Sequence, residues 1–179
     1  MPQLAARDGE TVTDNKKLYL PTDGKVIKNL RAGTFVSVYG TLYTARDQAH
    51  KRIAAAIRMC EKLPFDLNNA AIYYCGPTPA ADGQIIGSCG PTTSGRMDAY
   101  TPLLLEKGLK VMIGKGVRSP AVTQAIKERG AAYLTAIGGA AALYQSRVTA
   151  CELIAFPDLG CEAVYKLTVE DFPAVVSVV

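Results

Sequence analysis

The sequence lacks the cysteine patterns that mark secreted or metal-binding proteins. It has no tryptophan, a single histidine and five cysteines, none of which belongs to a CxxC pair. An odd number of widely spaced cysteines argues against a disulfide framework or a zinc site. Iron–sulfur clusters need closely organised thiolates. We therefore expect buried, reduced, structural thiols and no metal site on this chain.

Long apolar runs and targeting signals are also missing. No stretch of 18 apolar residues occurs, and the N-terminal segment lacks the apolar core of a signal peptide. We expect a cytoplasmic protein with no membrane contact. Neither GxxxxGK[ST] nor GxGxxG is present, so nucleotide binding has little support. The net charge of +4 comes from scattered Lys and Arg residues. A small anionic substrate explains this excess as well as nucleic acid does, and no basic run marks a nucleic-acid surface.

The patterns that are present predict one α/β domain. A chain of 179 residues with 49% hydrophobic content suits a single compact domain. We expect residues 1–14 to form a flexible arm and residues 15–179 to form the domain. The expected strands cover residues 17–20, 34–40, 70–75, 85–89, 110–113, 132–135 and 162–169. The expected helices cover residues 45–62, 97–107, 119–129 and 139–146. This alternation favours α/β layers with a mixed, partly parallel sheet.

Three polar, glycine-containing loops follow expected strands, where α/β folds assemble ligand sites. In the second loop, Thr92, Thr93, Ser94 and Gly95 precede Arg96. Hydroxyls, backbone N–H groups and a guanidinium there could converge on a carboxylate or phosphate. The alternative is that Thr92 or Ser94 only caps a helix and Arg96 makes a surface ion pair.

The first and third loops add cations and the histidine. Arg46 can fork onto a carboxylate, and His50 lies four residues later on the same helix face. His50 is either an acid–base candidate or a structural residue. Lys115, between two glycines, offers an unobstructed point charge. Arg118 either binds an anion or caps a neighbouring element.

Two acidic residues lie in the same loops. We expect Asp98, on the first turn of the helix over residues 97–107, to favour the helix dipole, and Asp47 to be a solvated helix charge. Three basic loops with hydroxyls and one histidine predict a site for a small di- or tricarboxylate or a phosphate. The patterns alone do not define a reaction.

Six segments in order resemble one family. They are TARDQAHKR, GPTTSGRMD, GKGVR, IGGAAA, DLGCEA and VEDFPA, within residues 44–174. Together they closely resemble the C-terminal domain or β subunit of class I fumarases and related tartrate dehydratases. The resemblance implies a swivelling β/β/α domain that closes over a [4Fe–4S] cluster carried by a partner α subunit, in an αβ heterodimer or α2β2 assembly. It also implies that the open iron binds the substrate hydroxyl or water.

The resemblance further implies roles for individual residues. Substrate binding falls to Arg46, Lys115 and the loop Thr92 to Arg96, and proton transfer to Thr92 or His50. The implied substrate is a small dicarboxylate. We favour fumarate and (S)-malate over L-tartrate or mesaconate, because Gly95, the GKGVR segment and the DLGCEA segment are more similar to fumarases. A non-catalytic module that binds carboxylate or phosphate is the more distant alternative.

Overall fold

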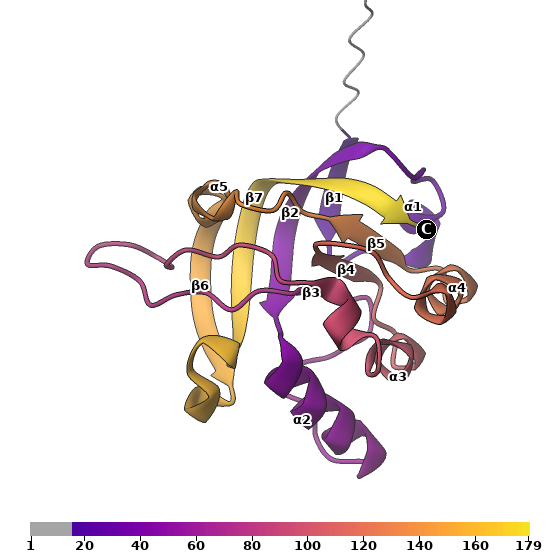
Figure 1. Ribbon diagram of the computed structural model, residues 1–179, viewed down its shortest axis with the longest axis horizontal. Coiled ribbons are helices and arrows are strands. Elements are labelled where there is room, and N and C mark those ends of the chain that lie inside the picture. Colours follow the sequence, from indigo (N-terminus) through magenta and orange to yellow (C-terminus); the bar gives the residue numbers. More distant parts are fainter. Residues whose placement is uncertain (1–15) are drawn as a thin grey trace, which may run out of the picture.

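The computed structural model describes residues 16–179, which form one mixed sheet with helices packed around it (Figure 1). The expected flexible arm lies outside the described residues, and the expected domain limits stay a prediction. The strands are β1 (Lys16–Leu20), β2 (Phe35–Thr44), β3 (Ala71–Tyr73), β4 (Val111–Gly114), β5 (Ala132–Thr135), β6 (Val148–Ala155) and β7 (Val164–Val178). The helices are α1 (Gly24–Ile27), α2 (Asp47–Arg58), α3 (Thr101–Glu106), α4 (Pro120–Glu128) and α5 (Ala141–Ser146), with 3-10 helices η1 (Ser94–Met97) and η2 (Pro157–Glu162).

The sheet closes on itself through its last strand. Strands β1 to β5 are parallel neighbours, in chain order. Strand β7 runs antiparallel to both β2 and β5, and it also pairs with the edge strand β6. The expected α/β class with a mixed sheet is confirmed, and a small closed sheet fits a swivelling β/β/α domain.

Side chains alternate between two cores because successive residues of a strand face opposite sides. Within β3, Tyr73 points into the closed sheet, where its ring contacts those of Tyr144 and Phe172. Ile72 and Tyr74 point outward into a second core, which α2, α3 and α4 cover. Strands β3 and β4 are therefore buried on both faces, so packing holds the sheet edge at their ends from both sides.

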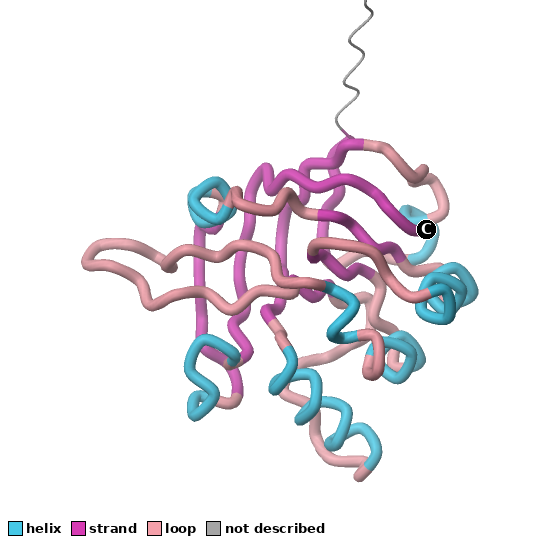
Figure 2. The backbone as a smooth tube through the Cα atoms, viewed as in Figure 1, coloured by secondary structure: helices cyan, strands magenta, loops and turns pink. Residues whose placement is uncertain are grey.

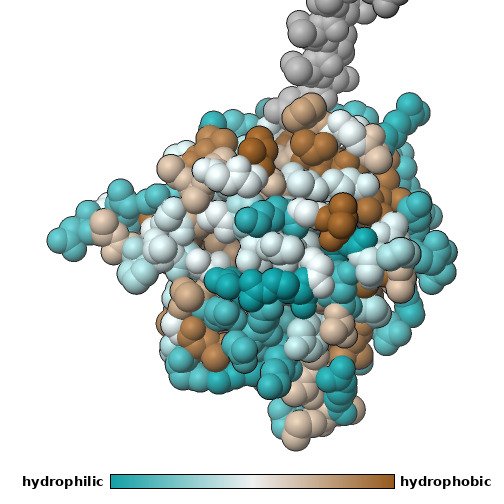
Figure 3. Space-filling model, in the orientation of Figure 1, coloured by the Kyte–Doolittle hydropathy of each residue, from teal (hydrophilic) through white to brown (hydrophobic). Residues whose placement is uncertain are grey.

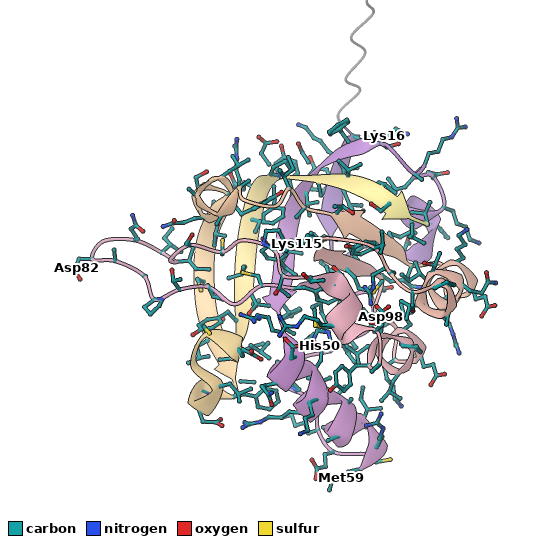
Figure 4. All side chains as sticks on the ribbon, viewed as in Figure 1. Lys16, His50, Met59, Asp82, Asp98 and Lys115 are labelled. Atoms are coloured by element: carbon teal, nitrogen blue, oxygen red, sulfur yellow. The ribbon has the colours of Figure 1, made fainter. Side chains whose placement is uncertain are left out.

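Helix α2 forms because one face is apolar. Ala49, Ile53 and Ile57 recur at helical spacing and are buried against the sheet. Asp47 in the first turn favours the helix dipole. The helix projects from the body of the molecule as far as the exposed Met59 (Figure 4). It confirms the expected helix, in a shorter form.

One expected strand is wrong. Residues 85–89 form no strand but one limb of a long hairpin loop, residues 76–90, that protrudes from the sheet with Asp82 at its tip (Figures 2 and 4). The limbs hydrogen-bond to each other, since Thr78 N donates to Ser88 O over 3.0 Å and Ser88 N donates to Thr78 Oγ1 over 2.8 Å. Side chains hold the second limb, since Gln145 Nε2 donates to Ile86 O over 2.9 Å and the Tyr73 hydroxyl donates to Cys89 O over 2.6 Å.

Other elements differ in extent. The expected helix over residues 97–107 is split into η1 and α3, because Pro102 at the start of α3 suits only a first turn. Elements α1, β6 and η2 were not predicted, and β7 continues well past its expected end at residue 169.

The cysteines are free, but the expectation that they are buried is only partly right. Cys75 and Cys89 are buried, Cys151 is half-buried, and Cys60 and Cys161 are exposed. Among the helices of residues 16–179, none combines the length and apolarity that a bilayer crossing requires.

Candidate functional site

The three predicted loops meet at one edge of the sheet. Arg46 follows β2 and Lys115 follows β4, so both lie where the parallel strands end. The loop Thr92 to Arg96, which we call the hydroxyl loop, follows the hairpin loop in the chain. It reaches the same edge, because Thr93 forms a parallel bridge with Lys115. We call Arg46, Thr92, Arg96 and Lys115 the rim.

Backbone hydrogen bonds fix the hydroxyl loop between the ends of β3 and β4. Thr92 N donates to Tyr74 O over 2.7 Å. Lys115 N donates to Thr92 O over 3.1 Å, and Ser94 N donates to Lys115 O over 2.9 Å. The loop thus adds a short strand segment to the sheet edge, with Thr93 exposed, Thr92 half-buried and Ser94 buried.

Ser94 faces away from the rim surface. Its Oγ lies 2.9 Å from the Tyr133 hydroxyl, which itself donates to Gly116 O over 2.7 Å. Since the proton of Tyr133 goes to Gly116, Ser94 is the donor in the first bond. The Ser94 hydroxyl therefore lies beneath the loop, whereas Thr92 and Thr93 lie closer to solvent. The predicted contact of Ser94 with substrate stays a prediction.

Arg46 has hydrogen-bonding capacity left over. Its Nη2 lies 3.7 Å from Glu162 Oε1, and its buried Nε has no hydrogen-bond partner within residues 16–179. Glu162 also accepts a bond from Gln48 N at the start of α2, over 2.8 Å. The side chain lies across Gly76, where an added Cβ would sit 2.7 Å from Arg46 Cδ. A half-buried guanidinium with open donors is suited to a carboxylate.

Arg96 pairs with a residue expected to be solvated. Its Nε donates to Asp47 Oδ1 over 2.9 Å, and its Nη2 lies 2.6 Å from Asp47 Oδ2. Both side chains are partly exposed. The expectation of a purely solvated Asp47 is wrong, because the aspartate at the start of α2 faces the hydroxyl loop.

Lys115 and Thr92 have no such partners. The Lys115 side chain is exposed, and its ammonium forms no ion pair within residues 16–179. The Thr92 hydroxyl likewise makes no hydrogen bond to this part of the chain. Figure 4 places Lys115 near the middle of the molecule, and the same view in Figure 3 shows hydrophilic atoms across that region. The rim therefore offers a cation and a hydroxyl free to meet a ligand.

His50 is fully buried below the rim. Its Nδ1 lies 2.9 Å from Arg46 O, an acceptor, so Nδ1 carries the proton and Nε2 is the bare nitrogen. Nε2 has no hydrogen-bond partner within the described residues. The imidazole packs edge-on against the ring of Tyr74, with 5.3 Å between the ring centroids. Burial lowers the pKa of His50 from 6.5 to about 4, aided by the nearby Arg118 charge. His50 is therefore neutral at pH 7, and its predicted proton-transfer role stays untested.

Arg118 and Asp98 form an ion pair that the sequence did not reveal, with the arginine fully enclosed and the aspartate partly exposed. Arg118 Nε donates to Asp98 Oδ1 over 2.7 Å, and Nη1 and Nη2 donate to Tyr74 and Thr101 over 3.0 and 2.5 Å. Asp98 Oδ2 accepts a hydrogen bond from Ser119 N, so the aspartate also holds the backbone at the N-cap residue of α4. The expectation that Asp98 serves a helix dipole is wrong, because no helix begins there. A pairing across loops leaves no local sequence signal.

Comparison with known proteins identifies related sequences. The family described as "Fumarase C-terminus" matches residues 1–179. "Fumarate hydratase 2" of Leishmania major is 45% identical over 148 residues, which cover 82% of this chain and 26% of that protein. "Fumarate hydratase class I, aerobic" of Escherichia coli (strain K12) is 43% identical over 147 residues, covering 81% of this chain and 27% of that protein.

In a shorter relative, the match to this chain covers most of the relative's own length. The "Putative L(+)-tartrate dehydratase subunit beta" of Methanocaldococcus jannaschii is 39% identical over 153 residues, covering 83% of this chain and 78% of that protein. The chain thus spans about a quarter of the length of the two fumarate hydratases. The resemblance to class I fumarases and tartrate dehydratases is confirmed, and the chain belongs to the fumarase C-terminus family, whose named relatives are hydro-lyases.

Proposed function

We propose that this chain acts as the β subunit of a class I fumarate hydratase that interconverts fumarate and (S)-malate. In this proposal it binds and orients the substrate with the rim, together with an α subunit that carries a [4Fe–4S] cluster. The observation that carries the proposal is the convergence of three cations and a free threonine hydroxyl at one sheet edge. The names of the relatives supply the substrate class.

The charges of the rim suit a dicarboxylate. Hydration of fumarate requires cations that hold two carboxylates and stabilise the charge that builds on one of them. Arg46 has open donors, and Lys115 has no ion-pair partner within residues 16–179, so both can take a carboxylate without breaking a strong bond. Arg96 would share or exchange its contact with Asp47. A guanidinium fork and a point charge bind carboxylates with different geometry, which helps to orient the substrate.

Thr92 is the better placed of the two proton-transfer candidates. Its hydroxyl makes no hydrogen bond within residues 16–179 and lies on the loop whose backbone pairs with that of Lys115. His50 is enclosed and donates its proton to Arg46 O, so it orients the backbone that carries Arg46. Thr92 therefore transfers the carbon-bound proton, and His50 positions a substrate-binding arginine.

The described residues do not fit the role of cluster holder. No group of three or more His, Cys, Asp or Glu side chains within residues 16–179 is arranged to hold a metal ion. The proposal therefore places the cluster on the partner, and gives this chain the work of binding, orienting and moving a proton.

L-tartrate dehydration is the second candidate, because one relative is named as a tartrate dehydratase β subunit. That name also supports the idea that this domain can work with its cluster-bearing partner on a separate chain. Mesaconate hydration would use the same carboxylate-binding rim. A non-catalytic carboxylate-binding module would use the rim without the partner.

The test is anaerobic co-expression with the cluster-bearing partner, followed by absorbance assays of fumarate, L-tartrate and mesaconate. We expect fumarate and (S)-malate to interconvert only when both chains are present. Preference for tartrate or mesaconate would change the substrate and keep the site. Inactivity of a complex with an intact cluster, or activity of this chain alone, would contradict the proposal.

A further inference from the structure

We propose that Arg118, Asp98 and Tyr133 form a buried tie that holds the two substrate-binding loops in register, and that all three are positioning residues for the reaction. This inference rests on the proposed function. None of the three lies on the rim, and each bonds to groups that carry or flank it.

The Arg118 guanidinium is the centre of the tie. Its side chain is 0% exposed, and all three nitrogens have protein acceptors. The group also lies 5.3 Å from the ring centroid of Tyr74 and 5.2 Å from that of Tyr133. Although burial alone would lower the pKa of Arg118, Tyr74 and Asp98 hold it above its usual value, so the group stays charged. Because its side chain is fully enclosed, a substrate anion cannot reach the guanidinium, which argues against the anion-binding alternative for Arg118.

The acceptors of Arg118 belong to different segments. Asp98 follows η1 and the hydroxyl loop, Tyr74 follows β3, and Thr101 begins α3. Arg118 itself stands on the loop that carries Lys115. One guanidinium therefore links the loop of Lys115 to the loop of Arg96 and to the sheet edge beneath both.

The Tyr133 hydroxyl is a second link between the same loops. It accepts a hydrogen bond from Ser94 Oγ and donates one to Gly116 O. Space for this link depends on Gly114, where any side chain would collide with Ser94 Oγ. The two links lie on the buried side of the loops, opposite the exposed side chains of the rim.

The tie acts on the rate through orientation. Thr92 and Arg96 lie on one loop and Lys115 lies on the other. A shift between the loops therefore changes the orientation of the Thr92 hydroxyl relative to the Lys115 ammonium that binds a substrate carboxylate. A misplacement of about 1 Å can cost about a hundredfold in rate. Binding depends less on this alignment, because flexible Lys and Arg side chains can still reach a carboxylate.

The experiment compares Tyr133→Phe and Arg118→Lys with wild type in the reconstituted complex. Tyr133→Phe removes only the hydroxyl and keeps the ring, so this variant should fold. We expect its kcat to fall at least about tenfold with a change in KM below about threefold. Hydrogen exchange at the Ser94 and Lys115 amides, which bond across the loops, should become faster. Arg118→Lys should show a larger loss of the same kind.

The matched control is Leu18→Val, which loosens the inner core at β1, a strand whose pairing within residues 16–179 is with residues 36–40 of β2. It should keep wild-type kcat and wild-type exchange at both amides. Wild-type kcat in Tyr133→Phe, or an equal loss of kcat in Leu18→Val, would overturn the tie. Inactivity of the wild-type complex on all three substrates would instead contradict the proposed function, while the amide exchange would still report whether the loops are joined.

Discussion

Lys115 and Arg118 stand on one short loop and have opposite surroundings. The Lys115 ammonium is exposed and has no ion pair within residues 16–179, whereas the Arg118 side chain is fully enclosed and all its nitrogens are bonded. The same contrast separates Arg96, in a partly exposed pair, from Asp98, in a buried one. Burial and the satisfaction of donors, more than charge, therefore separate the groups that can meet a ligand from the groups that support the fold.

The largest expected effect comes from removing the two charges in turn. Arg118→Met should lower the free energy of unfolding by about 3–5 kcal/mol, because it leaves Asp98 charged, largely buried and without its cation. Lys115→Met should change it by less than about 0.5 kcal/mol, since no partner is lost. Urea denaturation of both variants measures the difference. Equal losses would remove the distinction between rim and tie.

The second test concerns pH. His50 has a pKa of about 4 in the folded chain and about 6.5 when unfolded, so the unfolded state binds more protons between these values. Stability from this group is therefore complete above about pH 6.5 and is lost as pH falls towards 4, by an amount on the order of 3 kcal/mol. Urea denaturation at several pH values measures this dependence. It should be weaker in His50→Asn, and an identical dependence would mean that His50 is not kept neutral by burial.

The third test addresses the rim. In the reconstituted enzyme, Arg96→Lys keeps the charge but loses the planar fork, and kcat/KM should fall by about a hundredfold. The matched control is Arg129→Lys, because Arg129 makes an exposed pair with Glu106 over 3.5 Å, away from the rim. Steady-state assays of both variants measure kcat/KM, which should stay at the wild-type value in Arg129→Lys. Unchanged kinetics in Arg96→Lys would place Arg96 outside the substrate site.

The smallest expected effect comes from Asp47→Asn. Partly exposed ion pairs contribute at most about 1 kcal/mol, so the free energy of unfolding should fall by less than that amount. In enzyme assays KM should change by less than about fivefold, because the variant loosens Arg96 but also frees it from a competing carboxylate. A loss of stability as large as that of Arg118→Met would show that the rim pair is as structural as the tie.

Much of the fold could be predicted from the sequence because local patterns match local structure. The apolar spacing of Ala49, Ile53 and Ile57 predicts α2, and the short apolar run over residues 132–135 predicts β5. Residues 85–89 show the limit, since the same apolar pattern occurs in a loop limb that forms no strand and is bonded by the opposite limb and by the side chains of Tyr73 and Gln145. Strand β6 escaped prediction because most of its side chains are at least half-exposed, which leaves no alternation between the two faces.

The residues of the candidate site could be predicted, but not which of them are exposed and which are buried. The loops of Arg46 and Lys115 could be placed at strand ends, whereas the strand expected before the loop of Arg96 does not form. The structure nevertheless brings the three loops together. Burial of His50 and the Arg118 pair with Asp98 could not be foreseen, because both depend on contacts between distant segments. Sequence patterns indicate which groups lie at a sheet edge, and only packing decides which of them face inward.

Strand β7 has a consequence for how the chain reaches this structure. It pairs with β2 across more than a hundred residues of sequence, and every loop of the rim lies between the two strands. During synthesis the parallel strands emerge before the strand that closes the sheet. Non-local pairing of this kind slows folding, because loop-closure entropy is lost before the contacts are gained. Pairing of β2 with β7 is therefore expected to be a slow step, and it closes a long segment that contains every loop of the rim.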